Sequence, residues 1–351
     1  MNKEIKIGSN VISEKNPCFI IAEIGVNHNG DINLAKRMVD EALRCGANCV
    51  KFQTYRTERL VTKKSPKADY QLEVTNKEES QFDMLKKLEL STNQYEELIE
   101  YTKQTGTTFL STPYNIEDIE FLEKLGVEAF KVASGQIVEK PFLYALAEKG
   151  LPVIISTGMA YLSEIDEAVR VFKDSGNENL ILLQCTTNYP ASIEDSNIRA
   201  MTTMNKAFDC LVGYSDHTEN EISVLAAVAT GATIIEKHFT LDKSMPGPDH
   251  SSSANPEEMT SLVQNIRKTE LCLGNKYKSP SQIELNNSKG MRRSLVTISA
   301  IKKGDTLTKE NIGFKRPASG LHPNYIYKVT GKKVSTDLAA DSLLELSNIE
   351  W

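Results

Sequence analysis

Short apolar runs rich in β-branched residues alternate with amphipathic stretches along most of the chain. In segment 33–47, for example, Leu34, Met38 and Ala42 recur at the spacing of one helix face. Segments 161–174 and 255–274 have the same character. The apolar runs predict eight strands, over 18–24, 48–54, 107–112, 128–134, 152–158, 180–186, 210–215 and 232–238.

Strands that alternate with helices form a parallel sheet, and eight such units indicate a closed (β/α)8 barrel of the TIM type. An open doubly wound sheet is the alternative. Such a sheet more often has a Gly-rich phosphate turn after its first strand, but here that turn reads EIGVNHNG rather than GxGxxG. The predicted fold class is therefore α/β, with a TIM barrel over residues 1–275.

The pattern changes after the barrel. Residues 276–293 are polar and lack a long apolar run, which predicts a linker. Residues 294–351 contain short β-like runs and turn residues, which is typical of a small β-rich domain. A domain of this size has a marginal core, so we expect it to lean on the barrel or on a second subunit. Within the barrel, the charged excursion 55–90 is too long for a simple loop and predicts a lid or a substrate wall.

Polar residues at the carboxyl ends of barrel strands face the active site, which makes them candidate site residues. Every predicted strand ends in such residues, and a purely structural barrel would not need them. The candidates in chain order are Glu23, Lys51, Gln53, Thr112, Lys131, Ser134, Ser156, Thr187, Asn188, Tyr189, Ser215, His217, Glu236 and His238.

Two lysines, Lys51 and Lys131, lie inside apolar strands, where a buried ammonium is costly unless it meets an anion. With the hydroxyl groups of Ser134, Ser156 and Ser215 they could bind a phosphate and a carboxylate. A structural ion pair between each lysine and a strand glutamate is the alternative.

Glu23 and Glu236 are the carboxylates placed for proton transfer. We expect Glu23 to stay ionised, because two lysines and a metal would lie near it. Glu236 could serve the reaction, or it could pair structurally with Lys237 or with another neighbour.

His217 and His238 end neighbouring strands and could hold a divalent metal, the alternative being hydrogen-bonded structural histidines. Cysteine ligands are not expected at the rim, which disfavours a thiolate zinc site. Two imidazole ligands leave coordination positions of the metal open, which suits Mn²⁺, with Mg²⁺ or Co²⁺ possible. His28 and His250 are weaker candidates, and His28 could equally cap a turn.

Charge and composition restrict the class of protein further. The net charge of -6 is spread along the chain and gives no reason to expect nucleic acid or an anionic membrane as a partner. The start, MNKEIKIGSN, has no apolar signal segment, and no run is long enough to span a membrane, so we expect a cytoplasmic protein. The six cysteines form no CxxC pair and are expected to be reduced thiols.

Nine motifs carry a resemblance to a known family. They are AEIGVNHNG, KFQT, FLSTPY, KVASGQ, IISTGM, CTTNYP, GYSDHT, IEKHFTLDKSMPGPDHSSS and KRPASGLHP, in this order along nearly the whole chain. Together they resemble the N-acetylneuraminate (sialic acid) synthase family, which includes legionaminate and pseudaminate synthases. The resemblance implies condensation of phosphoenolpyruvate with an N-acetylated amino-sugar aldehyde, giving a nine-carbon keto acid and phosphate.

The resemblance also implies residue roles. Phosphoenolpyruvate would be bound by the two lysines and three serines named above, with Thr112 and the CTTNYP turn nearby, and the metal, usually Mn²⁺, by the two histidines. Gln53, Thr187, Asn188, Tyr189 and Asp249 would complete the substrate site. The C-terminal domain would be similar to antifreeze proteins (a SAF domain) and would donate Arg316 to the partner barrel of a domain-swapped homodimer. Gln136 departs from the family, whose members commonly have Glu there, and is expected to contact the sugar.

Alternatives remain open at this point. Three sugars are compatible with the resemblance: N-acetylmannosamine, a 2,4-diacetamido-2,4,6-trideoxy-mannose, and its altrose isomer, which gives pseudaminate. The motif PGPDHSSS and residues 65–90 favour the first two, whereas GLHP in the tail also occurs in pseudaminate-type members. Another phosphoenolpyruvate-dependent keto-acid phosphate synthase on the same barrel is a rival, although such enzymes are not expected to carry KRPASGLHP. A non-catalytic sugar-binding protein is the rival from another class.

Overall fold

The computed structural model describes residues 1–68, 71–72, 75–76 and 78–351. It divides the chain into two compact units, Met1–Gly274 and Asn275–Trp351, each of which is described by itself. Asp69, Tyr70, Glu73, Val74 and Lys77, which belong to the predicted excursion, lie outside the described residues. In the described part of the chain, no helix is both long and apolar enough to cross a membrane.

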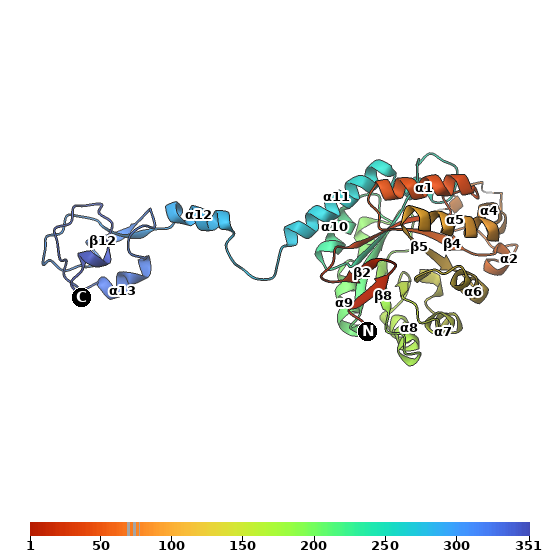
Figure 1. Cartoon of the computed structure of the whole chain (residues 1–351), viewed down its shortest axis with the longest axis horizontal. Coiled ribbons are helices and arrows are strands. Elements are labelled where there is room, and N and C mark those ends of the chain that lie inside the picture. The colour runs from red at the N-terminus through yellow and green to blue at the C-terminus, as the bar shows by residue number, and fades with distance from the viewer. Residues whose placement is uncertain (69–70, 73–74, 77) are drawn as a thin grey trace. The chain divides into compact units, whose positions relative to one another are not determined.

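The first unit is built on a parallel sheet that has eight strands among the described residues (Figure 1). The order around it is β5-β4-β3-β10-β9-β8-β7-β6, and the two end strands, β5 and β6, also contact each other. The sheet therefore closes into the predicted barrel and is not an open doubly wound sheet. The strands are β3 Phe19–Gly25, β4 Cys49–Thr54, β5 Thr108–Pro113, β6 Phe130–Val132, β7 Val153–Ser156, β8 Leu180–Cys185, β9 Leu211–Asp216 and β10 Ile234–His238.

Helices cover the outside of this barrel and connect successive strands (Figure 1). Side chains often fix where they begin: Asp31 caps α1, and Asn255 forms a reciprocal capping box with Glu258 at the start of α11. The helices are α1 Ile32–Arg44, α2 Thr57–Leu60, α4 Gln81–Leu88, α5 Thr92–Thr105, α6 Ile116–Lys124, α7 Lys140–Ala147, α8 Leu162–Asp174, α9 Arg199–Phe208, α10 Ile222–Ala229 and α11 Pro256–Leu273. Short 3₁₀ turns lie at Ser134–Gln136, Ile193–Ser196 and His250–Ser252.

An N-terminal hairpin, which the sequence pattern did not reveal, closes one end of the barrel. It pairs β1 Glu4–Ile7 with β2 Asn10–Ser13. Its Ile5, Ile7 and Ile12 are buried in one cluster with residues that begin barrel strands, such as Phe19 and Ile234. Because the hairpin covers the starts of the strands, the opposite end, where the strands finish, is left for a site.

The excursion after β4 is fastened at its base. Arg56 Nη1 donates to Glu89 Oε1 at 2.8 Å, and the backbone N–H of Thr57 donates to Glu89 Oε2 at 3.1 Å. Farther along, Arg59 Nη2 lies 2.6 Å from Asp118 Oδ1 of α6. These contacts join α2 to the end of α4 and hold the described part of the excursion against the barrel.

The second unit has a hydrophobic core of its own. Its strands β11 Ser294–Thr297 and β12 Ile312–Lys315 pair antiparallel, and its helices are α12 Gln282–Met291 and α13 Ile326–Val329, with 3₁₀ turns at Pro323–Tyr325 and Leu346–Asn348. Helix α12 lies inside the segment predicted as a linker and has no buried residue. The core residues are Leu295, Ile301, Leu307, Ile312, Leu321, Val329, Val334, Leu338, Leu344 and Ile349.

Candidate active site

One cavity of about 290 Å³ lies at the carboxyl ends of the barrel strands. Each of the eight strands contributes a lining side chain, as the strand-end pattern predicted. The predicted site residues that line it are Glu23, Lys51, Gln53, Thr112, Lys131, Ser134, Ser156, Thr187, Tyr189, Ser215, His217, Glu236, His238 and Asp249.

Strand alternation decides which side chains enter the cavity. Glu236 and His238 of β10 both line it, whereas Lys237 between them points to the opposite side of the sheet and pairs with Asp216 Oδ2 at 2.6 Å. Glu236 therefore does not pair with Lys237, because neighbouring residues of a strand face opposite ways. The other form of the structural alternative, a pair with a different neighbour, is present, since Lys51 and Lys131 each lie 3.7 Å from Glu236 Oε1.

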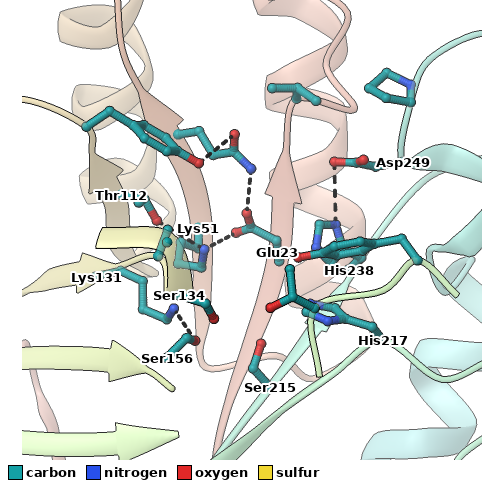
Figure 2. Close-up of a pocket in the computed structure, with 18 of the residues that line it drawn as sticks. Glu23, Lys51, Thr112, Lys131, Ser134, Ser156, Ser215, His217, His238 and Asp249 are labelled. Atoms are coloured by element: carbon teal, nitrogen blue, oxygen red, sulfur yellow. Dashed lines mark hydrogen bonds and ion pairs between the residues drawn. The ribbon is translucent and has the colours of Figure 1, made fainter. Parts of the chain in front are cut away.

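Two lysines and two glutamates that line the cavity form a buried charge cluster. Lys51 Nζ lies 2.8 Å from Glu23 Oε2 (Figure 2) and 3.7 Å from Glu236 Oε1. Lys131 Nζ lies 3.7 Å from the same Glu236 oxygen. The ion pairs that were the structural alternative for these lysines are thus present, and they hold both ammonium groups at the cavity surface, where an entering anion could reach them.

The protonation of this cluster differs from the expectation for Glu23. Burial, together with the nearby Glu236 carboxylate, raises the pKa of Glu23 to about 7, although Lys51 acts in the opposite direction. Glu23 is therefore not simply ionised at neutral pH, because Lys51 does not offset the loss of water around the carboxylate. For Glu236 burial also favours the neutral form, but Lys131 and Lys51 outweigh it and lower the pKa.

Hydroxyl groups surround the lysines. Lys131 Nζ donates to Ser156 Oγ at 2.6 Å, and Lys51 Nζ donates to Thr112 Oγ1 at 3.3 Å (Figure 2). Ser215 Oγ donates to Glu236 Oε1 at 3.0 Å. These contacts place hydroxyl donors and ammonium groups side by side, which is the chemistry that phosphate and carboxylate oxygens require.

Gly158 allows Ser134 and Thr187 to approach each other. A Cβ atom at this position would lie 2.3 Å from Thr187 Oγ1 and 2.8 Å from Ser134 Oγ. The Gly158 backbone N–H donates to Ser134 Oγ at 3.1 Å. A side chain at position 158 would therefore displace these two hydroxyl groups, which gives this position a reason to be glycine.

The two histidines of the predicted metal site lie together, with ring centroids 5.4 Å apart (Figure 2). His217 Nδ1 is 2.7 Å from the backbone carbonyl of Thr186, so this nitrogen has a structural partner. His238 Nδ1 is buried without a hydrogen-bond partner in the described part of the chain, and Asp249 Oδ2 lies 3.9 Å from it. Burial lowers the pKa of His238 well below its usual value, which keeps this imidazole neutral, as a metal ligand must be.

These residues fit a metal ion that takes only part of its coordination from protein. The described residues hold no group of three or more His, Cys, Asp or Glu side chains arranged to bind a metal. The unpartnered His238 nitrogen and its neighbour His217 are nevertheless the donors that a divalent ion with open positions would use. His28 is not among the lining residues, and its Nδ1 accepts from the Gly30 backbone N–H at 3.0 Å, so it caps a turn.

Three predicted site residues are placed elsewhere. Gln136 is buried beside the cavity but is not among its described lining residues, and its Nε2 donates to the backbone carbonyl of Tyr114 at 3.2 Å. Asn188 is exposed and donates to the carbonyl of Pro190 at 2.9 Å. Arg316 belongs to the second unit, where it follows β12 and is exposed.

The cavity also has lining residues that sequence reasoning missed. Cys185 of β8 lines it and was not among the residues expected at the rim. Tyr114, directly after β5, was within the FLSTPY motif but was not singled out. The apolar residues Val26, Leu60, Met84 and Leu85, here called the apolar wall, also line the cavity, and all four belong to one hydrophobic cluster. Three of them come from the excursion, which supports its prediction as a substrate wall.

The fold and this cavity define the class: a TIM-barrel enzyme whose polar site is built from the carboxyl ends of all eight strands. The sequence matches the NeuB family over residues 38–278 and the SAF domain over residues 292–350.

Relatives with known names are similar to this chain over nearly its whole length. The chain is 45% identical to N,N'-diacetyllegionaminic acid synthase of Legionella pneumophila, over 95% of each chain, and 37% identical to N-acetylneuraminate-9-phosphate synthase of Mus musculus, over 97% of this chain and 94% of the relative. The crystal structure of N-acetylneuraminic acid synthetase from Leptospira borgpetersenii has a TM-score of 0.74 and 37% identity, covering 82% of this chain and 95% of that one. The chain belongs to the NeuB family, whose members here include sialic acid and legionaminic acid synthases, and it carries a SAF domain.

Proposed function

We propose that this enzyme condenses phosphoenolpyruvate with an N-acetylated amino-sugar aldehyde, giving a nine-carbon sialic-acid-type keto acid and phosphate. The observation that carries the proposal is one cavity in which Lys51 and Lys131, each with hydroxyl neighbours, lie beside the pair His217 and His238. The relatives named as synthases of such acids support it.

The residues have distinct tasks in this proposal. Lys51 and Lys131, with Ser134, Ser156 and Ser215, bind the phosphate and carboxylate of phosphoenolpyruvate and offset their charge. A divalent ion on the two histidines, Mn²⁺ by the chemistry of this donor set, would act as a Lewis acid toward the sugar aldehyde.

Bond formation joins C3 of phosphoenolpyruvate to the aldehyde carbon. Water adds to the electron-poor C2, Glu23 accepts one proton from that water, and one proton is delivered to the former aldehyde oxygen, which becomes a hydroxyl. The C2–O bond to phosphate then breaks, the second proton of the water leaves with the phosphate, and C2 becomes the ketone. A carboxyl group with a pKa of about 7 suits this proton transfer, because a base works best when its pKa lies near the working pH.

We further propose a cytoplasmic, domain-swapped homodimer in which the SAF domain of one protomer serves the barrel of its partner. Arg316 is the residue that would reach the partner's sugar. Its exposed position directly after β12 supports this role. Two experiments test this proposal: sedimentation of the full chain, and activity after Arg316→Ala and Lys131→Ala protomers are mixed. We expect a dimer, and we expect mixing to restore activity, because the intact barrel of one protomer receives the intact Arg316 of the other. A monomer in sedimentation, with no activity after mixing, would contradict the proposal.

For the sugar we propose a 2,4-diacetamido-2,4,6-trideoxy-mannose. The aldehyde has to lie near the lysines and histidines at the strand ends, so the far end of the sugar extends toward the excursion and the apolar wall. A C6 methyl and a second acetamido methyl can pack against the apolar wall, whose side chains offer no hydrogen-bond partner to the hydroxyl groups of N-acetylmannosamine. Gln71 and Gln81, which also line the cavity, hydrogen-bond to each other at 3.3 Å.

The reaction is tested by phosphate release from phosphoenolpyruvate, with and without sugar, after EDTA treatment and after Mn²⁺ is restored. We expect release that needs both sugar and metal and that His217→Ala abolishes. A chain that binds sugar but releases no phosphate would be a binding protein, and full metal-dependent turnover in His217→Ala would refute the metal assignment.

The sugar is tested by mass spectrometry of the product and by kcat/KM for each candidate. We expect a preference of about 10- to 100-fold for the trideoxy sugar, the range that a hydrophobic contact supplies against an added hydroxyl. Leu85→Gln should narrow this preference, and Leu85→Met, which stays apolar, should keep it. Equal preference in all three proteins would show that the apolar wall does not select the sugar.

A further inference from the structure

Gln53, near the end of β4, links Glu23 to Tyr114. Its Nε2 donates to Glu23 Oε1 at 3.4 Å, and Tyr114 Oη donates to its Oε1 at 3.4 Å. An amide has one donor end and one acceptor end. If Gln53 were flipped, its carbonyl oxygen would face a carboxylate oxygen, so the carboxylate favours the orientation with the donor end of the amide toward Glu23. The Tyr114 hydroxyl then donates to Oε1 and holds the other end of the amide in place.

Tyr114 is held in place by protein contacts alone. Its backbone carbonyl accepts a hydrogen bond from Gln136 Nε2 at 3.2 Å. Its ring packs edge-on against the ring of Tyr55, with centroids 6.1 Å apart and planes at 88°. The backbone carbonyl of Gln53 in turn accepts from the Tyr95 hydroxyl. Both ends of the link therefore belong to the packed framework of the barrel.

The link completes the support of the Glu23 carboxylate. Lys51 Nζ lies 2.8 Å from Oε2, while Gln53 contacts Oε1. A single contact leaves a carboxylate free to rotate, whereas contacts to both oxygens fix its plane. Because proton transfer depends strongly on geometry, this fixed plane matters for a group that accepts a proton from a bound water.

We propose that Tyr114 is a positioning residue of the reaction: its hydroxyl orients Gln53, and Gln53 orients the Glu23 carboxylate. Gln136 belongs to the same chain of contacts, because its side-chain amide donates to the backbone carbonyl of Tyr114. Gln136 itself is not among the described residues that line the cavity. The inference rests on the proposed function, in which Glu23 accepts the proton of water.

Tyr114→Phe is the direct test, because it removes only the hydroxyl and keeps the ring against Tyr55. We expect kcat to fall about tenfold, the effect of losing one hydrogen bond that orients a base, with KM for phosphoenolpyruvate and for the sugar within twofold of the original. In a Gln53→Ala background the same substitution should have no further effect, because residues that act through one another are not additive.

Tyr55→Phe is the matched control. Its hydroxyl donates to the Leu85 carbonyl at 3.1 Å and is not part of the link, so we expect an unchanged kcat. An unchanged kcat in Tyr114→Phe, a loss confined to KM for the sugar, or an effect that persists without Gln53 would overturn the inference. A loss confined to KM would mean that Tyr114 contacts the sugar directly.

A second measurement does not depend on the proposed reaction. With ¹⁵N-glutamine labelling, the Gln53 side-chain amide signals, identified by their absence in Gln53→Ala, should shift in Tyr114→Phe and not in Tyr55→Phe. Unshifted signals would overturn the inference even if the original protein condensed no sugar, whereas failure of the proposed function alone would leave the shift in place.

Discussion

Lys131 carries a buried ammonium group. Replacing Lys131 by methionine separates the effect of this charge on folding from its effect on substrate binding. Its Nζ lies 3.7 Å from Glu236 Oε1, which corresponds to a gross attraction of about 4–5 kcal/mol at an effective dielectric constant of about 20. Removing the ammonium from water costs several kcal/mol as well, and burial, which outweighs the attraction of Glu236, lowers the pKa of Lys131. The two effects on folding nearly cancel.

Lys131→Met should therefore leave the protein as stable as before or slightly more stable. Glu236 keeps Lys51 at 3.7 Å and the Ser215 hydroxyl at 3.0 Å, so its carboxylate is not left unpaired. The binding of phosphoenolpyruvate, in contrast, loses one of two cations, and we expect kcat/KM to fall about 100-fold or more. Thermal unfolding and phosphate release, measured on the same preparations, check both halves.

Lys237→Met is the matched control. This lysine is equally buried but points away from the cavity, where it pairs with Asp216 at 2.6 Å. Its removal leaves a buried carboxylate without its cation, so we expect a loss of about 3–5 kcal/mol of stability, with KM for phosphoenolpyruvate unchanged. If Lys131→Met proved the less stable of the two, or kept its kcat/KM, the reasoning about the charge cluster would be wrong.

Three further predictions concern single residues. Gly158→Ala should raise KM for phosphoenolpyruvate at least tenfold with little change in melting temperature, because its Cβ would displace the two hydroxyl side chains it meets at 2.3 and 2.8 Å; an unchanged KM would refute this. Burial lowers the pKa of His28 to about 4, so the unfolded chain binds its proton first and stability should fall as pH drops from about 6.5 toward 4; urea titrations should show a flatter pH dependence in His28→Gln. Although burial opposes it, hydrogen bonds from Thr57 and Arg56 lower the pKa of Glu89 to about 2, so its contribution, about 1–2 kcal/mol, should be present above pH 4.5 and lost toward pH 2; Glu89→Gln should lack this acid-sensitive part.

Much of the site was predictable because strand ends in a barrel converge. The alternation of Glu236 and His238 with Lys237 places the first two on one face, and the same holds for Lys51 and Gln53 on β4. The position of these residues therefore followed from local pattern and fold class together. The N-terminal hairpin was not predicted, because each of its strands has only four residues and β2 does not alternate.

Gln136 shows where sequence reasoning stops. Its place after β6 predicts a residue near the cavity, and it is near, but its amide turns to the Tyr114 backbone. Likewise, the excursion was recognisable as a wall from its length, while its cavity-facing members depend on how α2 and α4 pack over the strand ends. Side-chain direction in such segments is set by long-range packing and not by spacing along the chain.

The amino-acid sequence by itself determined the barrel, the inward-facing polar residues of its strands and the family, because these depend on periodicity and on motifs that are local in the chain. Only the tertiary structure decided the protonation of Glu23, the support of that carboxylate by Gln53 and Tyr114, and the exclusion of Gln136 from the cavity lining. These properties arise from distances between residues far apart in the chain and from the exclusion of water by the closed barrel. Neither can be derived from the local pattern of residues along the chain.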